Sequence, residues 1–564
     1  MQNFPVEHHD DGFAWLQSTG AVRRLVRVVA ALWMSWLPIV VFGMPCVADP
    51  ESGPPHSCPR LPPLSSSTTL DAALDQFYEL RSCRLAWADT VRLDRLIAGI
   101  RALEGDGLVP ADYFLDRLER MRDRPASAAA PWDAESDALA TRAYLLALAH
   151  LYYGKVVPRE LYPDWNFEPR AANLADGLRV ANSALDEGDI AAMFARARPS
   201  HPVYAVLREA LGRLRAIAAV GGWPSIPAGP TLEPGARDPS VPALRHRLAV
   251  AGYGTDATED PELYDPVLAQ AVRDFQTEQY LDVDGRVGAA TREALNVPVA
   301  ARIDQVRVNL ERARWQLPEI KDDFVLVDIA GYKVSYYEGA TLKWMSRAQV
   351  GRPYRRTPSF RSVITHVTFN PTWTVPPTIL RNDVLPKVRR DSAYLAAHRL
   401  RAFDAAGNPL DPAGIDWSRA SGISLRQDAG ADNSLGRVAI RFPNPYGVYL
   451  HDTPHTELFD RQQRAFSSGC IRVERPLELV ELLLDDQSRW NRAALLQVTQ
   501  SGVTQSVALP RPVAVLLMYW SIDLHDGKRT AYKRDVYHRD AAVLAALDRP
   551  TALWPGWAPA FCPF

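Results

Sequence analysis

Two short stretches in the C-terminal third of the chain combine residue types that could carry out acyl transfer. Tyr449–Pro454 reads Tyr-Leu-His-Asp-Thr-Pro, and Ser467–Arg472 reads Ser-Ser-Gly-Cys-Ile-Arg. His451 therefore precedes Cys470 by 19 residues (470 − 451). A cysteine becomes a useful nucleophile when a neighbouring imidazole or positive charge favours its thiolate. The spacing predicts that two strands joined by a loop bring His451 to Cys470.

The residues that flank Cys470 predict the other parts of a catalytic site. Gly469 permits a close approach, and a backbone amide there could face a developing oxyanion. Arg472 would point the same way as Cys470 on an extended segment and could hold a carboxylate by a bidentate contact. Taken alone, Cys470 could equally be a small buried hydrophobe. Its register with His451, Gly469 and Arg472 favours a nucleophile.

This pattern resembles the L,D-transpeptidases of bacterial cell walls, whose YkuD-type catalytic domain carries a histidine followed by Ser-x-Gly-Cys-x-Arg. Ser468 stands where many members have a second histidine. That departure agrees with the large multidomain YcbB-like branch and leaves His451 as the base. The resemblance implies that the Cys470 thiolate attacks the third stem residue, usually diaminopimelate, of a donor tetrapeptide. D-alanine leaves, and an acceptor amine then takes the acyl group to form a 3→3 cross-link.

The resemblance also assigns roles around the nucleophile. The backbone of Ser468, Gly469 and Cys470 would support the oxyanion, and Arg472 would orient the site or the substrate. Peptidoglycan stem peptides are the implied partners, carbapenem-type inhibitors are expected to acylate the thiol, and no metal or organic cofactor is required.

The motif leaves the fate of the acyl group open. Transfer to a stem amine, hydrolysis as an L,D-carboxypeptidase and attachment of a protein amine all share one thioester intermediate. A non-catalytic peptidoglycan-binding protein that retains the fold is an alternative of a different class. Intact Cys470, His451 and Arg472 argue against it.

Two aromatic residues are candidates for substrate binding, together with Arg472. Tyr449 lies on the strand expected to deliver His451. Trp373, in the aromatic and proline-rich segment Phe369–Pro377, could wall the substrate cleft or pack against a sheet edge, because large aromatics dominate cores as well as sites.

The histidines near the motif do not predict a metal site. His451 and His455 have the spacing of a helical zinc pair, but Pro454 between them argues against that helix and no third ligand follows. His366 is expected on a strand without catalytic duty.

The composition limits the class of protein. At 564 residues the chain is too long for one core, and about two to four domains are expected. A formal net charge of −2 gives no electrostatic case for nucleic acid as a partner.

Residues 1–48 are typical of an export signal. Arg23, Arg24 and Arg27 precede an uncharged run over Val28–Met44, which ends near a site of small residues. That run of 17 residues (44 − 28 + 1) is at the lower limit for crossing a bilayer, so an uncleaved anchor is the alternative. The prediction is a periplasmic protein, attached to the inner membrane only if residues 28–44 are retained.

The five cysteines fit an exported protein. Cys46 would leave with a cleaved signal, and Cys470 must stay free to react. A disulfide could form among Cys58, Cys83 and Cys562 in an oxidising compartment, but the spacing does not determine the pairing.

Changes in the hydrophobic pattern along the chain predict an α+β multidomain fold with a mostly-β catalytic domain. Helical periodicity marks Leu70–Leu80, Val91–Leu103 and Ser136–Tyr153 as helices of a scaffold. Three short helices joined by glycine turns resemble a small peptidoglycan-binding module, with Leu244, Leu248, Val272, Phe275 and Leu295 as its core. The predicted domains are a helical scaffold at 49–235, the module at 236–298, a connecting helix at 299–322, the catalytic domain at 323–505 and a C-terminal β extension at 506–564.

An insertion at about 378–436 interrupts the catalytic domain. It is polar, partly helical and too long for an ordinary loop. We expect a lid subdomain over the cleft, as in the branch it resembles, because excluding water would favour an amine acceptor over hydrolysis.

Overall fold

The computed structural model describes residues 68–550 except 124–131, 164, 168–169, 171–172, 256–258, 318–321, 392, 420 and 526–528. The predicted export segment, Cys46, Cys58, Cys562 and the apolar C-terminal tail lie outside the described residues. Cys83 is disulfide-bonded and Cys470 is a free thiol. None of the helices in the described part of the chain combines the length and apolarity that a bilayer crossing needs.

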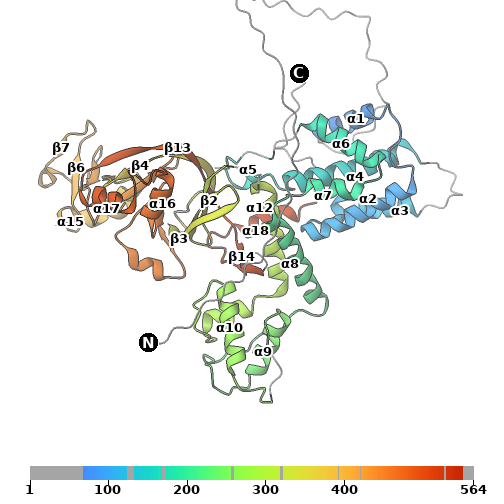
Figure 1. The fold of residues 1–564 in the computed structure, drawn as a ribbon, viewed down its shortest axis with the longest axis horizontal. Helices are drawn as coiled ribbons and strands as arrows, with labels where there is room; N and C mark the ends of the chain where they lie inside the picture. The colour runs from blue at the N-terminus through green and yellow to red at the C-terminus, as the bar shows by residue number, and fades with distance from the viewer. Residues whose placement is uncertain are drawn as a thin grey trace, which may run out of the picture. The chain divides into compact units, whose positions relative to one another are not determined.

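The N-terminal part of the described chain is helical (Figure 1). Helix α4 (Ala134–Tyr153) is buried around nearly its whole circumference, as expected for the central helix of a bundle. Its buried Asp137 accepts hydrogen bonds from the N–H groups of Ala86 and Trp87. The predicted helices are confirmed by α1, α2 and α4. The remaining elements are α1 (Thr68–Leu80), α2 (Thr90–Ala102), η1 (Leu103–Asp106), η2 (Pro110–Tyr113), α3 (Leu115–Arg122), α5 (Pro158–Leu161), α6 (Leu174–Asp186), α7 (Ile190–Ala197) and α8 (Pro202–Ala219).

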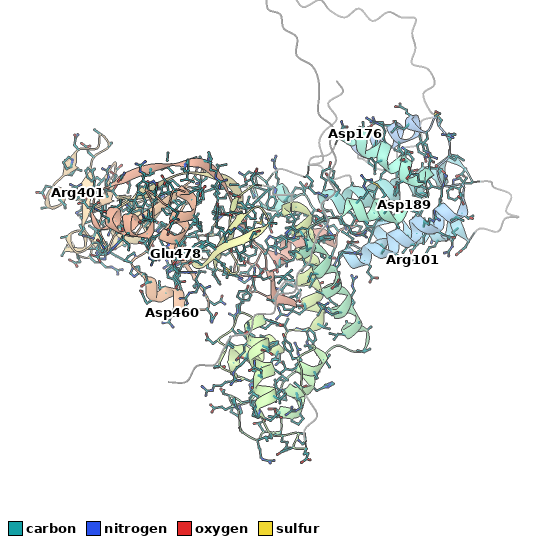
Figure 2. All side chains as sticks on the ribbon, viewed as in Figure 1. Arg101, Asp176, Asp189, Arg401, Asp460 and Glu478 are labelled. Carbon is teal, nitrogen blue, oxygen red and sulfur yellow. The ribbon has the colours of Figure 1, made fainter. Side chains whose placement is uncertain are left out.

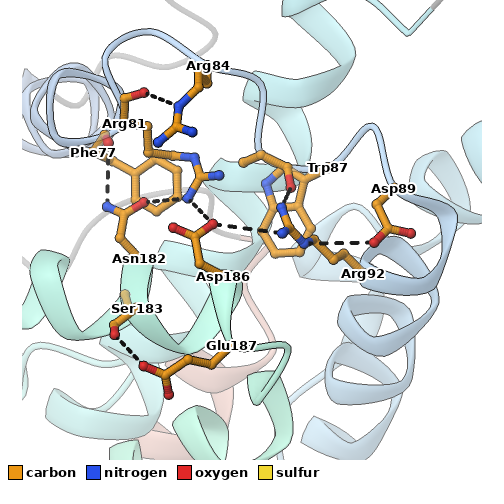
Figure 3. A network of polar contacts seen from close by, with 12 residues as sticks. Phe77, Arg81, Arg84, Trp87, Asp89, Arg92, Asn182, Ser183, Asp186 and Glu187 are labelled. Carbon is orange, nitrogen blue, oxygen red and sulfur yellow. Dashed lines mark hydrogen bonds and ion pairs between the residues drawn. The ribbon is translucent and has the colours of Figure 1, made fainter.

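A polar network fixes α6 against α1 and α2 (Figure 3). Arg81, just beyond α1, lies 3.0 Å from the Asp186 carboxylate and donates to Asn182 Oδ1 at 3.1 Å. Arg92 of α2 lies 3.8 Å from the same carboxylate. Folding brings these residues together across about one hundred positions of sequence, as the Arg81–Asn182 separation of 101 shows.

The next three helices enclose a core of their own. They are α9 (Val241–Val250), α10 (Pro266–Glu278) and α11 (Ala289–Leu295). The five predicted core residues are all buried in it, so the three-helix module is confirmed. Isolated bridges pair Leu232 with Val287 and Arg237 with Leu263.

Helix α12 (Val299–Gln316) follows the module and carries a buried charge network. Arg314 is fully buried, pairs with Glu311 and donates to the Asp106 carbonyl at 2.9 Å and to the Tyr204 hydroxyl at 2.8 Å. The buried Asp106 carboxylate accepts from Arg198 at 2.7 Å. Since buried charges need partners, these contacts hold α12 against α8 and η1.

The catalytic domain is built on one nine-stranded sheet in the order β11-β3-β12-β10-β9-β4-β13-β1-β2. A further pairing of β2 with β3 closes the sheet on itself. Helices α16 (Pro476–Leu484) and α17 (Arg492–Gln500) follow β12, and Glu478 of α16 accepts a hydrogen bond from Trp344 Nε1 at 2.9 Å (Figure 2 labels Glu478). The strands are β1 (Phe324–Asp328), β2 (Lys333–Glu338), β3 (Thr341–Gly351), β4 (Phe360–Phe369), β9 (Val438–Arg441), β10 (Leu450–His451), β11 (Ala465–Ser467), β12 (Ile471–Val473) and β13 (Gln505–Met518), with the 3₁₀ turn η5 (Thr456–Asp460).

The insertion has a separate core and a small sheet, in the order β5-β8-β6-β7. Its predicted helical parts are confirmed, but the sheet was missed because its strands span only two to four residues. Such short runs carry no readable alternation. The elements are β5 (Trp373–Thr374), α13 (Pro377–Ile379), η3 (Leu380–Val384), α14 (Leu385–Val388), α15 (Ala393–Ala397), β6 (Leu400–Phe403), β7 (Pro409–Leu410), η4 (Pro412–Gly414) and β8 (Ser424–Gln427).

The C-terminal residues complete the catalytic sheet, as predicted. Strand β13 lies inside the sheet between β4 and β1. The domain limit expected at 505/506 would assign nearly all of this strand to a different domain from the two strands that it pairs with. β14 (Ile522–His525) and β15 (Arg529–Tyr532) form a hairpin, and α18 (Asp540–Leu547) follows. Strand β15 ends at Tyr532, and the next residue, Lys533, pairs with Asp328.

Candidate active site

Two adjacent parallel strands place the predicted site residues together. Leu450 pairs with Ile471 and His451 with Arg472 across β10 and β12. The Ile471 N–H donates to the Tyr449 carbonyl at 3.0 Å, which extends this register back to Tyr449 and Cys470. Leu450 and Ile471 are wholly buried in the core, and side chains alternate along a strand. The opposite face therefore carries the four predicted side chains of Tyr449, His451, Cys470 and Arg472.

The geometry of His451 fixes the form of its ring. The side chain is buried, and Nδ1 lies 2.5 Å from the carbonyl oxygen of Asp452. A carbonyl only accepts hydrogen bonds, so Nδ1 carries the proton and Nε2 keeps its lone pair. Burial and the nearby Arg472 charge lower the pKa of His451 to about 3. The ring is therefore a neutral base at physiological pH.

Cys470 is half-buried, and its Sγ lies 3.7 Å from the Gly447 carbonyl. Burial raises the pKa of the thiol above its ordinary value, although the charges of Arg441 and Arg472 oppose that shift. The directions of the two pKa shifts favour a neutral thiol and a neutral imidazole on the same face of the sheet.

The loop before Cys470 is held by its own hydrogen bonds. Gly469 has φ +121°, a conformation open mainly to glycine, and its N–H donates to Ser467 Oγ at 3.1 Å. Ser467 Oγ in turn donates to the Cys470 carbonyl at 2.6 Å. Of the three predicted oxyanion donors, the Gly469 amide is thus engaged. For the amides of Ser468 and Cys470 the described residues supply no acceptor.

A second loop, which the sequence reasoning did not find, supports the first. Thr357 Oγ1 donates to the Gly469 carbonyl at 2.8 Å. The Tyr537 hydroxyl donates to the Gly351 carbonyl at 2.7 Å and accepts from the Thr357 N–H at 3.1 Å. A Cβ at Gly351 would lie 2.2 Å from the Arg355 carbonyl, so the loop requires glycine there.

Arg355 connects the motif to the insertion. Its guanidinium donates to Ser468 Oγ at 3.0 Å and forms an ion pair with Asp383 of η3. The Arg355 side chain is largely buried, which gives the pair more weight than a surface pair has. Arg355 therefore links the insertion to the loop before Cys470.

Two guanidinium groups flank Cys470. Arg472 donates to Gln349 Oε1 at 3.2 Å, and its buried Nε has no acceptor among the described residues. Arg441 of β9, which was not predicted, lies with Cζ 4.0 Å from the centre of the Tyr449 ring. Burial raises the pKa of Tyr449 to about 12, so the ring is neutral. The alternation of Arg441 with the apolar Val438 and Ile440 is a sequence signal that could have placed it on this face.

Trp373, His455 and His366 make no described contact with the Cys470 thiol. Trp373 packs against the core of the insertion through β5, and no described contact joins it to Cys470. His455 is exposed and lies 3.5 Å from Glu457, and the residues between it and His451 are not helical. His366 lies on β4, as predicted. The described residues contain no group of three or more His, Cys, Asp or Glu that could hold a metal ion.

Comparison with known families separates three parts of the chain. Residues 72–211 match a scaffold domain, residues 237–295 a "Putative peptidoglycan binding domain", and residues 322–498 the L,D-transpeptidase catalytic domain. Residues 322–498 are an L,D-transpeptidase catalytic domain. This domain contains Cys470, His451 and the other residues of the face described above.

A curated protein of Haemophilus influenzae, "Putative L,D-transpeptidase", is 35% identical over 242 residues, which are 42% of this chain. The match covers 48% of that relative, so the chain spans about half the length of the curated relative. Crystal structures of L,D-transpeptidases from Xylanimonas cellulosilytica and Stackebrandtia nassauensis are 16% and 13% identical, and each match covers 52% of this chain. The matches cover 99% and 96% of those chains, with TM-scores of 0.18 and 0.21. These scores are too low to support a structural comparison.

Proposed function

We propose that this protein is an L,D-transpeptidase that forms 3→3 cross-links in peptidoglycan through a cysteinyl acyl-enzyme. The observation that carries the proposal is the shared face of β10 and β12, where buried, neutral His451 and the free thiol of Cys470 lie in adjacent rows of a catalytic domain of this family. The peptidoglycan-binding match at residues 237–295 supports the polymer as the partner.

The chemistry proceeds in two acyl transfers. Cys470 Sγ bonds to the carbonyl carbon of the third stem residue as its proton passes to His451 Nε2. The amide bond to the terminal D-alanine then breaks, and the proton moves to the departing amine, which leaves a thioester. An acceptor amine attacks the thioester, its proton passes through His451 to the sulfur, and a 3→3 amide remains.

The backbone of the catalytic loop would stabilise the charge that develops on the substrate carbonyl. The amides of Ser468 and Cys470 are the donors available for this, and Gly469 sets the conformation that presents them. Arg472, two residues after Cys470 and on the same face of the sheet, adds positive charge there.

The insertion would act as a lid that limits hydrolysis. Its contact with Ser468 through Arg355 and Asp383 supports this role, since a lid that excludes water favours an amine over water as acceptor. Export to the periplasm, with the segment 28–44 as a cleaved signal or as an inner-membrane anchor, belongs to the same proposal.

Product analysis tests the proposal against its alternatives. We expect purified protein, given a diaminopimelate tetrapeptide stem as donor and a second stem as acceptor, to release D-alanine and yield a cross-linked dimer by mass spectrometry. Tripeptide alone would favour an L,D-carboxypeptidase, and transfer only to an added protein amine would favour protein attachment. Wall binding without D-alanine release would favour a non-catalytic binding protein.

A further inference from the structure

A line of four side chains crosses the catalytic sheet and ends at the nucleophile. The register pairs His366 of β4 with Arg441 of β9. β9 pairs with β10 at Ile440 and Leu450, so Arg441 lies beside Tyr449, and Tyr449 lies beside Cys470. These four residues are half-buried, whereas the next residues along their strands are buried in the core, so the four side chains occupy the opposite face of the sheet.

Arg441 is held in place without a counter-charge. Its guanidinium lies 4.0 Å from the centre of the Tyr449 ring, a cation–π contact that orients the group toward the middle of the line. No carboxylate of the described residues forms an ion pair with Arg441 or with Arg472. His366 adds no second positive charge beside Arg441, because burial and Arg441 lower the pKa of this histidine.

We infer that Arg441 binds a side-chain carboxylate of the acyl donor and thereby selects donors whose third residue ends in a carboxylate, with Tyr449 positioning the guanidinium. A half-buried guanidinium with no carboxylate partner among the described residues is suited to bidentate recognition of a carboxylate. This inference rests on the proposed function, since it concerns the substrate of that same site.

The distance across the sheet favours the side-chain carboxylate over the carboxylate of the departing residue. Neighbouring strands lie about 4.8 Å apart, so the backbones of Arg441 and Cys470, two strands apart, are separated by about 10 Å. A carboxylate at the far end of a diaminopimelate side chain is separated from the attacked carbonyl by the length of that chain. The carboxylate of the leaving alanine lies much closer to the sulfur, beside Arg472.

The test compares three tetrapeptide donors in wild type and Arg441→Gln by D-alanine (or D-alaninamide) release. One donor is unmodified, one carries a side-chain carboxamide at the third residue, and one carries a carboxamide on its C-terminal residue. We expect wild type to prefer the unmodified donor over the side-chain carboxamide by about 10- to 100-fold in kcat/KM, and Arg441→Gln to bring this ratio close to one. Any change in thiol reactivity cancels in the ratio, because both donors meet the same cysteine.

Matched variants separate binding from folding. Arg441→Lys keeps the charge and should retain part of the preference. Arg437→Gln removes an exposed charge that directly precedes β9 and should leave the ratio unchanged. Alkylation of Cys470 by iodoacetamide, a neutral reagent, reports whether each variant keeps a folded site.

Equal ratios in wild type and Arg441→Gln, or a preference lost only with the C-terminal carboxamide, would overturn the inference and leave the proposed function standing. Release from none of the three donors by protein that still reacts with iodoacetamide would overturn the proposed function and the inference together.

Discussion

Burial outweighs the nearby positive charges at Cys470 and acts together with them at His451. It raises the pKa of Cys470 despite two nearby guanidinium groups, and it lowers the pKa of His451 to about 3. The hydrogen bond from Nδ1 to the Asp452 carbonyl leaves Nε2 as the acceptor. In the proposed reaction, proton transfer to His451 would therefore accompany attack by the sulfur.

The rate at which iodoacetamide alkylates Cys470 should rise with pH from 6 to 9 without reaching a plateau near neutrality. The raised thiol pKa means that the thiolate fraction grows by about tenfold per pH unit in this range. His451, with a pKa of about 3, stays neutral throughout and adds no inflection between pH 5 and 8. Intact mass after timed alkylation measures the rate, and a plateau below pH 7 would instead indicate a thiolate–imidazolium pair.

At the scale of secondary-structure elements, the catalytic loop depends on segments that are distant in sequence. The loop at residues 351–357 and the C-terminal Tyr537 hold the Gly469 carbonyl through Thr357, and Arg355 adds the insertion to the same assembly. These residues are positioning residues, because they act through the loop and not on the substrate. Their removal should change the rate of acylation more than the stability of the domain.

Tyr537→Phe should slow acylation by a carbapenem by about tenfold. It removes two neutral hydrogen bonds, to Gly351 and Thr357, each worth about 0.5–1.5 kcal/mol. Stopped-flow acylation and a thermal melt measure the two effects. Tyr354→Phe, which alters an exposed hydroxyl of the same loop, is the matched control, and equal rates in the two variants would contradict the supporting role.

Asp383→Ala should raise the ratio of hydrolysis to cross-linking by a few-fold, because it breaks the ion pair between the insertion and Arg355. Quantifying tripeptide and cross-linked dimer from the same reaction gives the ratio. Asp432→Ala, which removes a highly exposed carboxylate of the same insertion, should leave it unchanged. An unchanged ratio in Asp383→Ala would argue that the insertion does not limit access of water through this contact.

Sequence reasoning found the site residues that belong to one local motif, and it missed the contacts that form only when distant segments pair in the fold. Cys470, His451 and Arg472 were found because one motif and strand alternation suffice to place them on one face. Arg441 was missed, because only the register of β9 against β10 brings it to Tyr449. Thr357 and Tyr537 are 180 residues apart, and no spacing rule connects a turn to a residue so far along the chain. The strands of the insertion were missed because they are too short to show an alternation of apolar and polar residues.

At the scale of the whole molecule, buried hydrogen bonds connect the helical scaffold to the helix that precedes the catalytic domain. Asp106, with no exposed surface, accepts from Arg198 and Tyr204 and lies 2.8 Å from Arg208. Arg314 of α12 reaches the Asp106 carbonyl. The buried Arg314 guanidinium thus joins α12 to the scaffold by hydrogen bonds to the Asp106 carbonyl and the Tyr204 hydroxyl, and the Asp106 carboxylate holds the scaffold side through Arg198 and Arg208.

Asp106→Asn should destabilise the protein by about 3 kcal/mol, since removing one member of a buried ion pair leaves the other charges uncompensated. The temperature of the first unfolding transition, followed by calorimetry, measures the effect. Asp176→Asn is the control, because this carboxylate is exposed on α6 and pairs only at the surface (Figure 2). Equal melting of the two variants would show that the Asp106 network contributes little.

Formation of the acyl-enzyme is the step on which every other proposal depends. Intact mass should be measured for wild type and Cys470→Ala after incubation with a diaminopimelate tetrapeptide stem, and again with a carbapenem. We predict a covalent adduct on wild type alone, together with release of D-alanine from the stem. Folded wild-type protein that forms no adduct with either reagent and releases no D-alanine would contradict acyl transfer by Cys470.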